Sequence, residues 1–269
     1  MNKELTIAIE AAIAGGEEIM KIYNSKDFQV EIKDDSSPLT IADKNANDRI
    51  MEFLIPTDIK IISEENKQLA YEDRKNWDVC WIVDPLDGTK EFIKKNGEFT
   101  VNIALIKNGL PVLGVIYVPA TSVLYYADVE QGKGYKTTIK NTRDFSSDIN
   151  NSEEIRRSLL GENLKIVGSK SHMNDDTLNY IDSLKDTYSK GVEIVSMGSS
   201  LKFCLVAEGL ADVYPRFAPT MEWDTAAGQA ICNAVGLEVI DKGTNENMKY
   251  NRENLLNNNF LVSNLGKVI

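Results

Sequence analysis

Two short apolar runs that each end in carboxylates constrain the fold of this chain most. Residues 59–63 read IKIIS and precede Glu64, and residues 79–83 read VCWIV and precede Asp84. Runs of this length without alternation are typical of strands buried on both faces, as in sheets covered by helices. The sequence therefore predicts buried strands that carry acidic side chains at their carboxyl ends, and we look for chemistry there.

The rest of the first half predicts helices and an antiparallel meander around those strands. Residues 3–23 and 40–54 place apolar side chains at helical spacing, and Thr40 is a suitable N-cap for the second helix. Residues 28–32 alternate like a half-buried strand, and residues 99–140 alternate around turn glycines like a meander of strands.

The second half alternates predicted strands with predicted helices, which indicates a partly parallel sheet. Its strands are expected near 164–168, 192–196, 211–214 and 237–240, and its helices near 174–185, 199–208 and 224–235. We therefore expect a mixed α/β protein in three parts: an N-terminal α+β half (1–140), a polar connection (141–163) and a C-terminal α/β half (164–269).

Composition limits the partners of the chain. Its formal net charge is -11, which opposes nonspecific binding to nucleic acid polymers and anionic membranes, so a small anionic substrate needs a local cation. The three cysteines are an odd number without CxxC spacing, which argues against disulfides and zinc and favours a reducing cytoplasm. A peripheral position at the inner membrane face stays open. No run is apolar enough to predict a signal peptide or a transmembrane segment.

The densest chemical signal is the hexapeptide that follows the second apolar run, Asp84-Pro85-Leu86-Asp87-Gly88-Thr89. We expect Pro85 to stop the strand, so that Asp84, the Leu86 carbonyl and Asp87 face one point. Gly88 lets the backbone approach a ligand, and a helix that begins near Thr89 would offer N–H groups to a phosphate. The competing interpretation is an ordinary Asp-Gly turn between two elements.

Glu64 and Asp224 indicate a metal site only when they are considered together with that hexapeptide. Alone, Glu64 would be solvated surface, and Asp224, before a small-residue helix, would be an N-cap. Carboxylates and a carbonyl form the ligand set of a hard cation such as Mg²⁺, whereas zinc prefers His or Cys. Two such ions would polarise a phosphoryl oxygen, activate a water and stabilise a leaving oxygen.

Three motifs in this order and spacing resemble the inositol monophosphatase superfamily of lithium-sensitive, magnesium-dependent phosphatases. They are Ser63-Glu64-Glu65, DPLDGTKEF at 84–92 and WDTAAG at 223–228. Longer stretches at 84–106, 198–209 and 214–228 resemble the 3'(2'),5'-bisphosphate nucleotidases of that superfamily. The resemblance implies a layered αβαβα sandwich of the inositol monophosphatase and sugar phosphatase type.

The resemblance also implies roles for individual residues. It implies two or more Mg²⁺ ions per active site, with the ligands Glu64, Asp84, the Leu86 carbonyl, Asp87 and Asp224. It implies that Asp43, Thr89 and Glu64 are catalytic, with Asp43 and Thr89 orienting the attacking water. It implies a substrate site that consists of Gly88, Thr89, His172, Ser199, Lys202, Arg216 and Asp224. Lys170, in the loop of His172, stands where close relatives tend to carry Arg.

The function that we expect is hydrolysis of the 3'-phosphate of 3'-phosphoadenosine 5'-phosphate by metal-activated water, which gives AMP and phosphate. A phosphatase for inositol monophosphate or fructose bisphosphate is the alternative, because the metal core does not specify the alcohol. A noncatalytic nucleotide-binding protein is a third possibility, which the complete acidic set disfavours. The resemblance implies a monomer, although other members of the superfamily pair.

Overall fold

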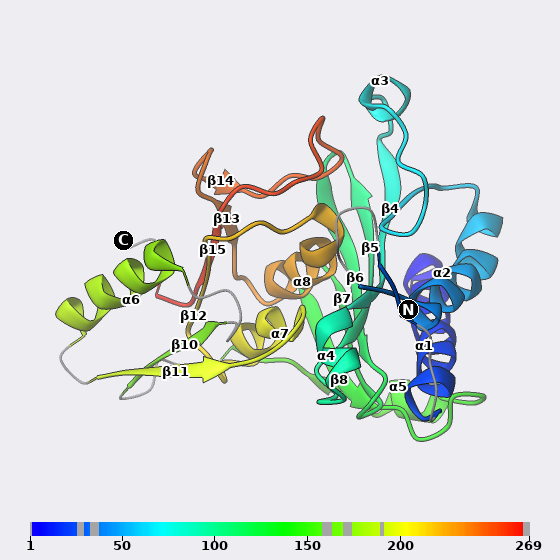
Figure 1. The fold of residues 1–269 in the computed structure, drawn as a ribbon, viewed down its shortest axis with the longest axis horizontal. Coiled ribbons are helices and arrows are strands. Elements are labelled where there is room, and N and C mark those ends of the chain that lie inside the picture. The colour runs from blue at the N-terminus through cyan, green and yellow to red at the C-terminus, as the bar shows by residue number, and fades with distance from the viewer. Residues whose placement is uncertain are drawn as a thin grey trace.

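The protein is a layered sandwich of two sheets and three helical layers. The computed structural model describes residues 2–25, 30–32, 38–157, 163–168, 174–188 and 191–265, and every structural statement below concerns these residues. Figure 1 shows the layers from right to left: α1 and α2, the first sheet, α7 and α8, the second sheet, and α6. The expectation of an αβαβα sandwich is therefore confirmed.

The first sheet has seven strands, and two of them lead into the acidic motifs. In spatial order its strands are β3 (Lys60–Ser63), β4 (Val79–Asp87), β5 (Thr100–Lys107), β6 (Leu110–Val118), β7 (Val123–Asp128), β8 (Lys133–Thr138) and β9 (Glu153–Glu154). β3 and β4 are parallel, and the other neighbours are antiparallel, which confirms the meander. Because β3 and β4 run in the same direction, their acidic ends lie at the same edge.

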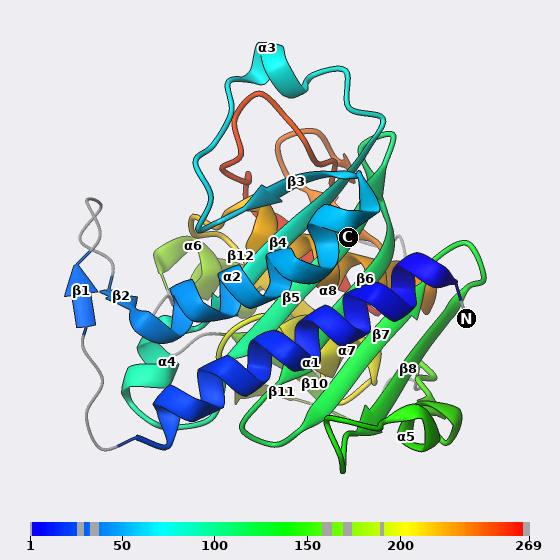
Figure 2. The same cartoon turned by 90° about the vertical axis from the view of Figure 1, so that its right-hand side faces the viewer.

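Two helices cover the outer face of the first sheet. They are α1 (Lys3–Tyr23) and α2 (Ile41–Leu54), which lie side by side across the strands in Figure 2. Their apolar faces bury side chains such as Leu5, Ile9 and Ile50 in one apolar cluster that also includes Trp81 of β4. Each such side chain contributes roughly 1.5–3 kcal/mol of burial free energy. A 3-10 turn, η1 (Ile55–Thr57), contains Pro56 and ends α2.

The second sheet has six strands and shares a core with the first. In spatial order they are β11 (Val192–Ser196), β10 (Leu164–Gly168), β12 (Val213–Arg216), β15 (Phe260–Ser263), β13 (Val239–Asp241) and β14 (Glu246–Asn247). β10 is parallel to both β11 and β12, and the remaining pairs are antiparallel, so the sheet is partly parallel as expected. A separate two-stranded sheet contains β1 (Val30–Ile32) and β2 (Pro38–Thr40).

Helices α7 (Leu201–Ala207) and α8 (Glu222–Ala234) fill the space between the two sheets. One apolar cluster includes residues of both helices and both sheets, such as Ile82, Phe203, Ile231 and Phe260. The outermost helix, α6 (Asp175–Thr187), covers the second sheet. Short helices complete the fold: α3 (Tyr71–Arg74), α4 (Thr89–Ile93) and α5 (Ser146–Asn150). In the part of the chain that the structure describes, no helix has the length and apolar character needed to cross a bilayer.

The structure corrects three sequence-based expectations. Pro85 does not stop β4, because the strand continues to Asp87 through a bulge: Asp84 pairs with Asn102 and Asp87 pairs with Thr100. Proline, which has no N–H, is tolerated at such a bulge. Asp224 does not precede its helix but lies in the first turn of α8, whose N-cap is Met221. Strands β2, β9, β14 and β15 were not predicted, since they are short or lie in polar sequence, and β9 lies within the expected polar connection 141–163.

Candidate active site

The end of β4 positions the first acidic ligands. Asp84 is almost fully buried, and its Oδ1 accepts the N–H of Leu86 at 3.0 Å. The Thr89 hydroxyl donates to the Leu86 carbonyl at 3.4 Å. Gly88 has a φ of 91°, in the left-handed region, and a Cβ on it would lie 3.1 Å from the carbonyl oxygen of Glu98. Glycine therefore suits this turn, at which α4 begins.

Three carboxylates from two elements meet at this point. Oxygens of Asp84, Asp87 and Asp224 lie within 4.8 Å of one another. The first turn of α8 holds Asp224, whose Oδ2 accepts the N–H of Met221 at 2.8 Å. Glu64 follows β3 directly, and its N–H donates to the Val83 carbonyl at 3.2 Å, beside Asp84. The structure thus brings together four acidic residues that are up to 160 positions apart in the sequence (224 minus 64).

Crowding and burial raise the pKa values of these carboxyl groups. Burial raises the pKa of Asp84 well above its usual range, and the charges of Glu64, Asp87 and Asp224 raise it further. Burial also raises the pKa of Asp224 to about 8, and the charges of Asp87 and Glu64 add to this effect. Like charges at this distance destabilise one another unless a cation lies between them.

The donor chemistry of this cluster fits a hard divalent cation. The cluster offers carboxylate oxygens, and the Leu86 carbonyl lies beside them, whereas the soft or imidazole ligands that zinc prefers are lacking among the described residues near it. A divalent cation would offset the repulsion that raises these pKa values. These residues therefore could hold Mg²⁺.

Asp43 lies near this cluster, although it is not among the residues that line the cavity. It is fully buried in the first turn of α2, and its charge contributes to the raised pKa of Asp84. Its sequence context, Thr-Ile-Ala-Asp at a helix start, gives no local reason for such burial. The position agrees with what the family resemblance implies for Asp43.

Basic and hydroxyl groups line the same cavity as the carboxylates. The cavity has a volume of about 290 Å³, and Thr89, Ser199, Lys202 and Arg216 line it together with the acidic ligands. Arg216 ends β12, and its Nη2 donates to the Pro219 carbonyl at 3.1 Å. Its Nε is buried and has no hydrogen-bond partner within the described parts of the chain, so a donor remains for an anion.

Lys202 is the buried cation of the site. Its Nζ donates to the carbonyls of Ser199, at 2.5 Å, and Met197, at 3.4 Å. Burial lowers its pKa to about 8, while the charge of Asp87 opposes this effect and that of Arg216 adds to it. An ammonium group in such a place gains from an anionic partner. A phosphate group that enters the cavity would supply that partner.

Ser200 also lines the cavity, and the sequence analysis did not single it out. Its N–H donates to the Asp87 carboxylate, and its hydroxyl donates to Asn102 Oδ1 at 2.7 Å and lies 2.8 Å from Thr100 Oγ1. Ser200 thus connects a metal-ligand candidate of the first half with the loop before α7. The only local signal was its place before a helix, which is typical of an ordinary N-cap.

The cavity therefore unites nearly all the residues that the sequence singled out. Its lining includes Glu64, Asp84, Leu86, Asp87, Gly88, Thr89, Ser199, Lys202, Arg216 and Asp224. Tyr214, Thr220 and Glu91 line it as well and were not predicted. His172 lies outside the described residues.

The layered fold with a carboxylate cluster between two sheets defines a class of phosphatase-like proteins, and comparison with known proteins gives the family. The sequence matches the inositol monophosphatase family over residues 1–268. The chain belongs to the inositol monophosphatase family. It is 44% identical over 255 residues to the 3'(2'),5'-bisphosphate nucleotidase CysQ of Salmonella typhimurium, an alignment that covers 92% of this chain and 94% of that protein. The CysQ of Buchnera aphidicola is also 44% identical, with coverage of 97% and 94%.

Solved structures agree with the family and the fold. The crystal structure of CysQ from Bacteroides thetaiotaomicron has a TM-score of 0.86 and 48% identity, and the match covers 97% of this chain and 96% of that one. The suhB protein of Bartonella henselae has a TM-score of 0.76 at 23% identity, with coverage of 98% and 95%, which supports the fold alone.

Proposed function

We propose that this protein is a magnesium-dependent 3'(2'),5'-bisphosphate nucleotidase that hydrolyses the 3'-phosphate of 3'-phosphoadenosine 5'-phosphate to AMP and phosphate. One observation carries the proposal: a cavity that has three carboxylates within 4.8 Å of one another is also lined by Lys202 and Arg216. In a substrate with two phosphates, one phosphate would bind at the metal ions held by the carboxylates and the other would bind Lys202 and Arg216. The names of the relatives at 44% identity support the same substrate class.

Each group of residues has a role in this proposal. Glu64, Asp84, the Leu86 carbonyl, Asp87 and Asp224 would hold two or more Mg²⁺ ions. Bound Mg²⁺ would lower the pKa of a water and stabilise negative charge on the phosphoryl group. The chain's own Asp43 and Thr89 orient the water that attacks the 3'-phosphorus, while the bond to the 3'-oxygen breaks and that oxygen takes up a proton.

The second phosphate selects the substrate. Lys202 offers a compact charge and Arg216 a planar fork of donors, and Ser199, in the loop between β11 and α7, lines the same cavity. His172 belongs to the proposed substrate site on the family resemblance alone. We further propose that the protein is a monomer and that it works in the reducing cytoplasm. The three free, buried thiols support the proposed compartment.

A phosphatase for inositol monophosphate or fructose bisphosphate is the second candidate. Sheet and helix arrangement do not separate it from the nucleotidase, because both would use the same acidic cluster. The two cations that line the cavity, Lys202 and Arg216, favour the nucleotide, since a monophosphate bound at the metal ions would bring no second phosphate to them.

Phosphate release by the purified protein with Mg²⁺ tests the proposal. We expect a strong preference for 3'-phosphoadenosine 5'-phosphate over inositol 1-phosphate and fructose 1,6-bisphosphate in kcat/KM. The Asp87→Asn variant serves as the control for contaminating phosphatases, and its turnover should fall by a factor on the order of a thousand. A preference for inositol or sugar phosphate would contradict the nucleotide assignment but keep the metal chemistry. Near-normal turnover by Asp87→Asn would contradict the mechanism.

A further inference from the structure

We propose that residues 250–257, here called the strap, set the affinity of the site for divalent cations by holding the first turn of α8 against the loop that follows Glu64. This inference rests on the proposed function only in taking Asp224 and Glu64 as metal ligands. The strap residues are positioning residues, because they act on those ligands through other side chains and backbone groups.

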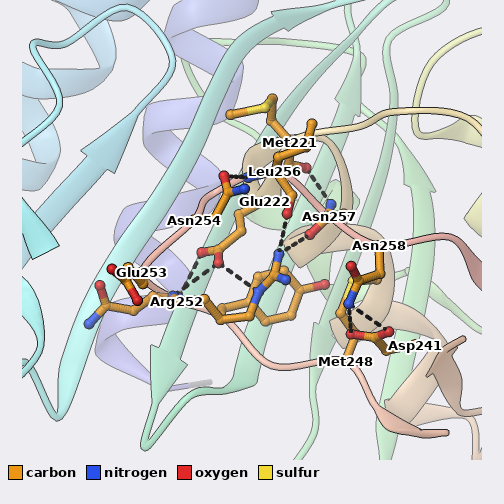
Figure 3. Close-up of polar contacts among 12 residues, drawn as sticks. Met221, Glu222, Asp241, Met248, Arg252, Glu253, Asn254, Leu256, Asn257 and Asn258 are labelled. Carbon is orange, nitrogen blue, oxygen red and sulfur yellow. Dashed lines mark hydrogen bonds and ion pairs between the residues drawn. The ribbon is translucent and has the colours of Figure 1, made fainter. Parts of the chain in front are cut away.

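The first support is a buried carboxylate that the strap alone satisfies among the described contacts. Glu222, in the first turn of α8, is fully buried. Its oxygens accept the backbone N–H of Asn251 at 2.7 Å and that of Arg252 at 3.1 Å, and also the Arg252 Nε at 3.1 Å. Figure 3 shows Arg252 beside Glu222. A buried carboxylate held by three donors fixes the place of the helix terminus.

The second support is a short chain of hydrogen bonds from the strap to Asp224. Asn257 is buried, and its Nδ2 donates to the Met221 carbonyl at 2.7 Å and to Thr225 Oγ1 at 3.0 Å. The Met221 N–H in turn donates to the Asp224 carboxylate at 2.8 Å. Arg252 Nη2 holds Asn257 by donating to its Oδ1 at 2.7 Å. One residue, Met221, thus connects the strap with the metal-ligand candidate.

The third support is the attachment of the strap to α3, in the connection between β3 and β4 that begins with Glu64. Arg74 is the last residue of α3, and only 3% of its surface is exposed. Its guanidinium donates to the Asn251 side chain at 2.9 Å and to the carbonyls of Arg252, at 2.6 Å, and Glu253, at 2.9 Å. The Asn251 amide returns a hydrogen bond to the Arg74 carbonyl at 2.8 Å.

The electrostatics of the site explain why such an attachment matters. Asp84, Asp87, Asp224 and Glu64 repel one another, and this repulsion favours movement of α8 away from β4. The contacts of the strap oppose that movement before any cation binds. Groups that orient metal ligands in advance raise metal affinity, and loss of an outer partner typically lowers it by roughly 10–100-fold.

Two neighbouring asparagines give a matched test. Asn257 contacts the first turn of α8, whereas Asn258 donates to both carboxylate oxygens of Asp241 on β13, at 3.1 Å each, and Figure 3 shows the two side chains directed to different partners. The dissociation constant of Mg²⁺ would be measured by isothermal titration calorimetry, with folding checked by circular dichroism. We expect Asn257→Ala to raise the dissociation constant roughly tenfold and Asn258→Ala to change it less than about twofold.

A second variant keeps the test decisive if Asn257→Ala does not fold. Arg252→Lys retains a positive charge for Glu222 but loses the fork that holds Asn257, so Mg²⁺ binding should weaken about threefold or more. Weaker Mg²⁺ binding should also appear as a higher Mg²⁺ concentration for half-maximal phosphate release at unchanged nucleotide KM. If Asn257→Ala, or Arg252→Lys in its place, binds Mg²⁺ with the same dissociation constant as Asn258→Ala and the unaltered chain, the proposed role of the strap is wrong. The metal centre itself would not be contradicted by that result. Absence of Mg²⁺ binding by the unaltered chain would overturn the metal centre as well.

Discussion

At the scale of single residues, the protonation state of Lys202 is expected to control activity on a substrate that has a second phosphate. Its pKa of about 8 means that the ammonium form declines as pH rises through that value, since burial disfavours the charge. We expect kcat/KM for the bisphosphate nucleotide to fall roughly fivefold between pH 8 and about pH 9, because a neutral amine cannot form an ion pair with the second phosphate. A pH profile of kcat/KM, fitted for a single descending limb, checks this expectation.

Lys202→Arg is the control for this effect, since a guanidinium keeps its charge throughout that pH range. Its profile should lack the descending limb, and so should the profile of the unaltered protein with inositol 1-phosphate, which has no second phosphate. The same descending limb in Lys202→Arg would assign the titration to another group.

At the scale of elements, the packing of α7 against α8 sets the place of the two helices that carry Lys202 and Asp224. Gly228 of α8 lies against Phe203 of α7, and a Cβ on Gly228 would lie 2.3 Å from the phenyl ring. We expect Gly228→Ala to lower the free energy of unfolding by about 1–3 kcal/mol, because overpacking exceeds the gain in helix propensity of up to about 1 kcal/mol. Urea unfolding measures the change.

The double variant Gly228→Ala with Phe203→Leu tests the cause. Removal of ring atoms gives the new methyl group space, so the double variant should be more stable than the sum of the two single changes. A Gly228→Ala protein that is as stable as the unaltered chain would mean that α7 shifts without cost.

At the scale of the whole molecule, the acidic cluster connects stability with metal and pH. The folded-state pKa values of Asp84, Asp87 and Asp224 are raised above their unfolded values, so these groups favour folding at low pH and lose that contribution as pH rises through the folded values, about 8 for Asp224. We therefore expect the Tm increase caused by Mg²⁺ to be larger at about pH 8 than at about pH 6. Thermal unfolding with Mg²⁺ and with a chelator checks this.

Asp84→Asn separates this cluster from the other acidic groups of a chain with net charge -11. This variant should raise the Tm of the metal-free protein, since it removes a buried charge, and should lose most of the stabilisation by Mg²⁺. An Mg²⁺ effect of equal size in Asp84→Asn would place the stabilising ions elsewhere.

Much of the fold and of the candidate site followed from local sequence. The helical spacing of residues 3–23 and the apolar runs before Glu64 and Asp84 predicted their elements. Burial of one helical face leaves a periodic pattern, and burial of both faces of a strand leaves an uninterrupted apolar run. The oxygen ligand set predicted a hard cation, because ligand chemistry depends on residue type. The family resemblance added Asp43, whose burial has no local signal.

Only the tertiary structure decided the contacts between distant polar residues. Asn257 reads as one of several asparagines in a polar stretch, yet it supports the helix that carries Asp224, and Arg74 contacts a carbonyl 178 positions away. The bulge at Pro85 likewise depends on the pairing of β4 with β5. Such contacts have no periodicity along the chain, because their partners become neighbours only when the two sheets close on α7 and α8. The sequence by itself thus determined the layers and the chemistry of the site, whereas the packed fold decided which ordinary residues hold that chemistry in place.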